Sequence, residues 1–160
     1  MPIPPLPPFR SAGVRALVLL HERELRAFLP VWERARAAGF ALPATTDPAY
    51  ASHGALLFHV FGAARGYLVW ICSSLEIADP EVSPTPPAER IEGEARERLE
   101  HLLERWRIAL AEVPDERVED RAYPSRWGPP YTIDAMLEHA VMHPIRHRFQ
   151  LENWLAGAPR

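Results

Sequence analysis

The chain has few of the features that mark extracellular or nucleic-acid-binding proteins. Cys72 is its only cysteine, which excludes an internal disulfide and is typical of a protein kept in a reducing cytosol. The apolar residues around it favour a buried core position over a nucleophile. Lysine is absent, all 18 basic residues are arginine, and the formal net charge is -3. Because domains that bind nucleic acid carry a basic surface, this charge balance argues against such a partner.

Long uninterrupted apolar runs are also missing. The most apolar stretch, residues 55–71, contains His59 and Arg65 and is too short and too polar to span a bilayer. The first residues, MPIPPLPPFR, lack the charged-then-apolar pattern of a secretory signal. We therefore expect a cytoplasmic protein with no membrane partner.

Signals for β-strands are nearly absent, and no phosphate-binding glycine loop or Ser/His/Asp arrangement is evident. Apolar residues recur instead at helical spacing in four segments, at about 11–38, 48–75, 88–112 and 132–155. Ser11 and Asp47 are suited to cap the first two segments, and Gly39 is suited to end the first. Pro30 lies inside the first segment, where proline is expected to kink or split a helix.

Four amphipathic helices joined by proline-rich connections predict an all-α four-helix bundle. A chain of 160 residues fits one domain, residues 1–160, in which residues 1–10 form a proline-rich extended lead. The third segment is rich in Glu and Arg and allows many ion pairs between residues four apart. The connections after the second and third segments are long for simple hairpins, so the direction of each helix stays open.

Three histidines at four-residue spacing, His139, His143 and His147, lie in the last segment. Residues four apart follow one stripe of a helix, so two imidazoles one turn apart can bind one metal ion. His59 lies in the second segment among small residues, which leave room beside an imidazole or let another helix approach. Two histidines from one helix and one from a facing helix would form a zinc-type centre with one position open to water or substrate.

Spacing alone cannot choose between His139 with His143 and His143 with His147. Histidines beside apolar residues are also common as hydrogen-bonded core residues, and in that case no metal binds. Pro144 can bend the helix just beyond His143, either towards a site or away from it.

The remaining histidines are less suited to ligation. His53 lies six residues before His59 and faces another side of the helix, in a first-turn or surface role. His21 and His101 have charged neighbours in the sequence and are expected to be solvated or at the boundary of the core. Trp127 and Tyr131 could line the mouth of a pocket or pack over the end of the bundle.

The run EHAVMHPIRHRFQ resembles the C-terminal helix of the DinB-like metal-binding helical-bundle family, whose pattern is roughly His-xxx-His-xxx-His-Arg-Gly-Gln. His147, Arg148 and Gln150 match the end of that pattern, and the run HGALLFHVFGAARGYL resembles the second helix of the family. Helix order and spacing extend the resemblance over most of the chain. Phe149 stands where the family has glycine, and Pro144 is not part of the common pattern.

The resemblance implies a metal triad of His59, His143 and His147. His139 matches a frequent histidine of the family that is not a ligand. Several residues are candidates for a second layer or for a pocket beside the metal. Three arginines among them could bind an anionic group such as a carboxylate, or each could be a surface residue of an arginine-rich chain. These candidates are His139, Gln150, Arg148, Arg146 and Arg65.

The resemblance also implies a class of function. The expected cofactor is a divalent metal ion, zinc or nickel first, with iron, cobalt and copper as alternatives that imidazoles also accept. Relatives of known activity are similar to transferases or isomerases that use a low-molecular-weight bacterial thiol, and some are hydrolases. The expected partners are therefore a small molecule such as this thiol and a second copy of the chain. The alternative is a non-catalytic, stress-associated metal-binding dimer.

Overall fold

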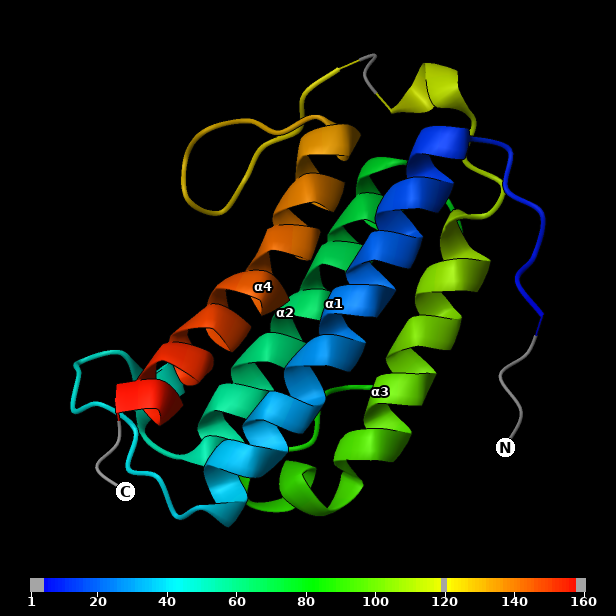
Figure 1. Cartoon of the computed structure of the whole chain (residues 1–160). Helices are drawn as coiled ribbons and strands as arrows, with labels where there is room; N and C mark the ends of the chain where they lie inside the picture. The colour runs from blue at the N-terminus through cyan, green and yellow to red at the C-terminus, as the bar shows by residue number, and fades with distance from the viewer. Residues whose placement is uncertain (1–4, 119–120, 158–160) are drawn as a thin grey trace.

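The elements of the chain are four long helices and two short turns of 3₁₀ helix (Figure 1). The computed structural model describes residues 5–118 and 121–157. In these ranges it contains no β-strand, which confirms the predicted all-α four-helix bundle. The elements are α1 (Ala12–Ala37), η1 (Pro48–Tyr50), α2 (His53–Ser74), α3 (Ala88–Leu110), η2 (Asp115–Arg117) and α4 (Ile133–Gly157).

Local signals set both ends of α1. The Ser11 hydroxyl accepts a hydrogen bond from the backbone N–H of Val14 at 3.0 Å, as an N-cap does. Gly39 has a φ of 62°, and the next residue, Phe40, donates its N–H to the carbonyl of Ala35. Pro30 lies inside α1 on its exposed side, and the helix continues through it, so the predicted split does not occur.

The second helix starts later than the sequence indicated. Asp47 caps only the short turn η1, where its carboxylate accepts the N–H of Ala49 at 2.9 Å. The chain then extends at Ser52, whose hydroxyl accepts the N–H of Ala55, and α2 begins at His53. The predicted start at Pro48 is therefore wrong, because a second cap interrupts the helical run.

The helices run two in one direction and two in the other. In Figure 1, α1 and α4 descend together, whereas α2 and α3 ascend together. α1 packs on α4 and α3, and α2 packs on α3 and α4. The connection 75–87 therefore runs back along the bundle from the end of α2 to the start of α3. Arg105 of α3 donates a hydrogen bond to the carbonyl of Pro80, and Arg65 of α2 donates one to the carbonyl of Val82. The bundle is not up-down-up-down.

Ion pairs join α3 to α1 rather than following α3 alone. Among the ion pairs of the described residues, only Glu94 with Arg98 lies within α3. The others of this face cross between the two antiparallel helices, where several charges can act together. The crossing pairs are Arg36–Glu92, Glu33–Arg96, Arg26–Glu100 and Glu22–Arg107.

Two tryptophans are fully buried in the core, and each has a hydrogen-bond partner for its indole N–H. Trp32 donates its indole N–H to the carbonyl of His53, and Trp106 donates to that of Ala64. His21 packs on Trp106 with ring centroids 4.3 Å apart and is only 1% exposed. The expectation of a solvated or boundary residue is wrong for His21, because its place on the inner face of α1 decides its burial and its charged sequence neighbours do not.

By length and composition α2 could also cross a membrane, so the expectation that its apolar stretch is too short and too polar to span a bilayer is wrong. Half of its most apolar window is buried by the other helices, as expected for the central helix of a bundle. Because a core helix passes the same test, this observation is weak evidence for a membrane segment.

Candidate metal centre

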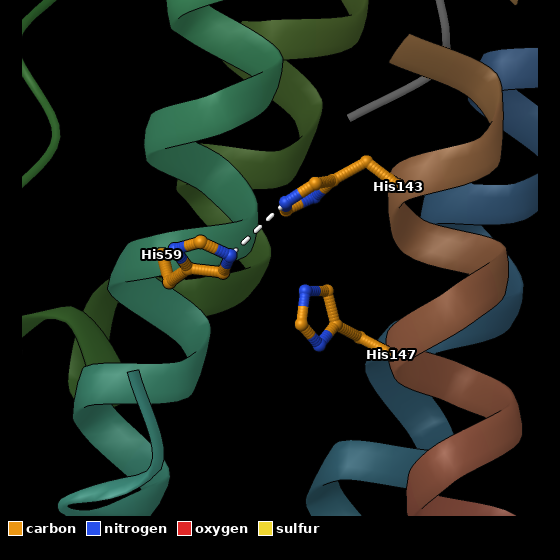
Figure 2. A group of neighbouring side chains, drawn as sticks. All are labelled: His59, His143 and His147. Atoms are coloured by element: carbon orange, nitrogen blue, oxygen red, sulfur yellow. Dashed lines mark hydrogen bonds between the residues drawn. The ribbon is translucent and has the colours of Figure 1, made fainter. Parts of the chain in front are cut away.

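Three histidines from two helices meet between α2 and α4. Figure 2 shows the His59 ring reaching from α2 towards the rings of His143 and His147, which lie one turn apart on α4. The ring centroids are 4.7 to 5.0 Å apart in all three pairs. One ring nitrogen from each histidine lies within 4.8 Å of the others, so the cluster could hold a metal ion.

The spacing of the nitrogens is close to that of a metal centre. The Nε2 atoms of His59 and His143 are 3.0 Å apart. Two nitrogens about 2.05 Å from a tetrahedral ion would be about 3.4 Å apart. The His59–His143 pair is therefore within about 0.4 Å of the spacing that a tetrahedral ion requires, and the nitrogen of His147 lies within 4.8 Å of both. With three protein ligands, a tetrahedral ion would keep one position for water or another molecule.

Burial keeps these imidazoles neutral, which is the form that binds metal. Burial, together with the neighbouring His147 and His59, lowers the pKa of His143 to about 2. Burial likewise lowers the pKa of His147 to about 4 and lowers the pKa of His59. At neutral pH, protons therefore do not compete with a metal ion for these lone pairs.

Hydrogen bonds orient His147. The Tyr50 hydroxyl donates to Oε1 of Gln150 at 2.8 Å and lies 3.2 Å from Nδ1 of His147. Because the only proton of the hydroxyl goes to Gln150, its oxygen accepts the Nδ1–H of His147. Arg146 lies 3.3 Å from Nε2 of His147 and can only donate. Both contacts place the lone pair of His147 on Nε2, the nitrogen nearest the other two rings (Figure 2). Because Arg146 donates to this same lone pair, its guanidinium has to move aside before Nε2 can bind a metal ion.

Sequence reasoning missed Tyr50. If residues 48–75 formed one helix, Tyr50 would be nine residues from His59 and about 180° away around the axis. The turn η1 breaks that register and brings Tyr50 beside the triad. The second cap at Ser52 is the signal that could have revealed this position.

The three candidate arginines have different positions. Arg146 lies at the triad. Arg148 instead pairs with the buried carboxylate of Glu24 on α1 at 2.9 Å and fastens α4 to α1. Arg65 donates to the Val82 carbonyl on the connection 75–87. Only one arginine of the expected anion-binding rim therefore contacts the cluster.

His139 lies one turn before His143 and outside the triad. Its ring is 5.6 Å from the rings of both Tyr67 and Tyr131 and 6.1 Å from that of Trp127. The structure therefore groups His143 with His147 and places His139 in an aromatic environment.

The two departures from the family pattern do not block the centre. α4 continues through Pro144, which is buried, and His143 and His147 remain together across it. Phe149 is 62% exposed, so its ring lies towards solvent. A surface cavity of about 380 Å³ lies elsewhere, between the ends of α2 and α3, and is lined by residues such as Leu75, Arg105 and Ile108.

Comparison with known proteins gives no relative. No family model matches the chain, and no curated protein or solved structure that was compared matches it either. The case for this site is therefore its own geometry and chemistry.

Proposed function

We propose that the protein binds one divalent metal ion through His59, His143 and His147 and uses it in catalysis. The observation that carries this proposal is the approach of three neutral imidazoles from two helices to within 4.8 Å. Zinc and nickel suit this nitrogen set best, and iron, cobalt and copper also accept it. A centre with three protein ligands can lower the pKa of a bound water or thiol and present it as a nucleophile.

The proposed reaction class is transfer to or from a low-molecular-weight bacterial thiol, or hydrolysis. Resemblance of the two histidine-bearing helices to the DinB-like family supports this class. His59, His143 and His147 hold the ion, and Tyr50 fixes the tautomer of His147 through its hydrogen bond. Arg146 supplies positive charge beside the open position, where it can orient an anionic substrate. We also propose that the protein acts in the cytoplasm as a homodimer.

Metal content tests the ligand set. Untagged wild-type protein, His147→Ala and His139→Ala are loaded with zinc, dialysed without chelator and measured by elemental analysis. We expect about one equivalent in the wild type and in His139→Ala, because His139 lies outside the triad, and a loss of most of it in His147→Ala. Wild type that retains no metal after loading refutes the site. Loss of metal in His139→Ala together with its retention in His147→Ala would assign the site to the pair His139 and His143.

Exchange of the ligand at the open position of the metal ion then distinguishes a catalytic centre from a non-catalytic metal site. A bacillithiol- or mycothiol-type thiol is added to the cobalt-substituted protein, whose visible spectrum reports the ligands of the ion. A catalytic centre gives a new sulfur-to-metal band that saturates with thiol. An unchanged spectrum, with no hydrolytic or thiol-dependent turnover, would refute the catalytic function and support the alternative, a non-catalytic metal-binding bundle.

A further inference from the structure

An aromatic cluster lies one helical turn from the triad. It consists of Tyr67 and Trp70 of α2, Trp127 and Tyr131 of the connection before α4, and His139 of α4. Neighbouring ring centroids in the cluster are 5.6 to 6.4 Å apart. Trp127 meets the other four rings nearly edge-on, at 68 to 82°. The cluster is thus built around one side chain.

The aromatic cluster reaches from the core to the surface, because Tyr67 is buried in the core and Trp70 and Tyr131 are partly buried against it. Trp127 is 50% exposed, and His139 is exposed as well. The loop that carries Trp127 is fixed at its base, where the backbones of Tyr123 and Tyr131 exchange two hydrogen bonds. Gly128, with a φ of 110°, makes the turn next to Trp127. Ring surface is therefore held in place but left open to a ligand.

Glycines keep the path between the triad and the cluster open. His59, Gly62, Gly66 and Trp70 follow one stripe of α2, since they differ by three or four residues. A methyl group at Gly62 or Gly66 would meet no atom within 4 Å. Glycine inside a helix costs about 0.5–1 kcal/mol relative to alanine. Packing against a neighbour therefore does not explain either glycine. Their effect is to leave the surface of α2 between His59 and Trp70 free of side chains.

Charge selects the other part of the ligand. Arg146 is an exposed arginine whose guanidinium lies 3.3 Å from Nε2 of His147, next to where a metal ion would bind. A carboxylate can both coordinate a metal ion and accept hydrogen bonds from arginine. His139, the ring of the cluster nearest to the triad on α4, is four positions from His143 and seven from Arg146, which are about 6 Å and about 10.5 Å along the helix. An acid group and a ring separated by one or two carbon atoms would span the shorter of these distances, and the long side chain of Arg146 would reach back along α4 to the acid group.

We propose that the surface between the triad and the aromatic cluster binds a small aromatic carboxylate. Its carboxylate lies against Arg146 and the open position of the metal ion, and its ring packs on Trp127 and His139. This proposal rests on the proposed metal centre for one contact, but the arginine and ring contacts do not require the metal.

Affinity for three related acids tests the proposal. Phenylacetate, cyclohexylacetate and acetate are titrated by calorimetry into metal-loaded and metal-free protein. The variants are Trp127→Ala, Trp127→Phe and Arg146→Gln, with Phe149→Ala as a control that removes an exposed ring of α4 outside the cluster. In wild type and in Phe149→Ala, phenylacetate should bind at least about fivefold more tightly than acetate, as expected for one added aromatic contact.

The variants separate the two ends of the ligand. The preference for phenylacetate over acetate should fall to about onefold in Trp127→Ala and persist in Trp127→Phe, whereas Arg146→Gln should weaken both acids. Equal binding of phenylacetate and acetate by the wild type, or a preference unchanged in Trp127→Ala, overturns the proposal. Equal binding of cyclohexylacetate and phenylacetate overturns the choice of an aromatic acid.

A failure of the metal centre gives a different result. Protein that never retains metal refutes the proposed function, yet its preference for phenylacetate still measures the ring contact. Protein that retains metal without that preference refutes only the aromatic ligand.

Discussion

The close approach of α2 to α3 makes Gly54 sensitive to a single methyl group. Gly54 is the second residue of α2 and is buried. A Cβ there would lie 2.2 Å from the carbonyl oxygen of Ala88 and 3.1 Å from its carbonyl carbon. An ordinary contact is at least 3.4 Å, so the starts of the two helices would have to separate by roughly 1 Å. Backbone atoms cannot rotate away as a flexible side chain can.

The expected effect of Gly54→Ala is a lower free energy of unfolding. Overpacking of this kind costs about 1–3 kcal/mol, and the better helix propensity of alanine returns less than about 1 kcal/mol. A net loss of about 2 kcal/mol lowers Tm by roughly 4–8 °C in a chain of this size. Calorimetry and urea unfolding at neutral pH measure both quantities.

Gly93→Ala is the matched control, because it lies on α3 five residues after Ala88 and its new methyl group meets no atom within 4 Å. This variant should be more stable than wild type by up to about 1 kcal/mol. If Gly54→Ala is as stable as Gly93→Ala, the first turns of α2 and α3 do not pack as closely as in this structure.

Three further predictions concern single side chains. Tyr50→Phe removes the hydroxyl beside Nδ1 of His147 and should weaken metal binding about 10- to 100-fold in a chelator competition, and equal affinity would contradict its orienting role. Burial lowers the pKa of His21 to about 3, below its usual value of about 6.5, so folding stability falls as the pH drops from 6.5 towards 3. His21→Leu should reduce this acid slope by up to about 1.4 kcal/mol per pH unit in urea titrations, and an identical slope would refute it. Burial raises the pKa of Cys72 to about 11, so iodoacetamide should label it slowly at pH 8 until urea is added, and rapid labelling of native protein would contradict its burial.

Local patterns were enough to predict the four helices. Apolar periodicity and the caps at Ser11 and Gly39 are properties of neighbouring residues, so the sequence carries them directly. The direction of the helices was not predictable, because a connection of 13 residues such as 75–87 can either turn back or run along the bundle. The Glu and Arg side chains of α3 pair with α1 for the same reason, since their partners depend on helix direction.

The candidate site was predictable where it depends on helical spacing. His143 and His147 share a stripe of α4, and His59 stood out among small residues on a facing helix. The family resemblance then selected His147 over His139. Tyr50 could not be found, because its position depends on the turn that precedes α2. The roles of Arg146 and Arg148 were equally hidden, because residues two apart on a helix point to nearly opposite sides and only packing decides what each contacts.

X-ray absorption spectroscopy of the zinc-loaded protein tests the central claim most directly, because it counts and identifies the atoms around the ion. The account predicts three imidazole nitrogens at about 2.0–2.1 Å and one further ligand, such as water, that exchanges with solvent. One imidazole should be lost in His59→Ala. A spectrum with one imidazole or none, or one unchanged in His59→Ala, would show that the rings of α2 and α4 do not share an ion.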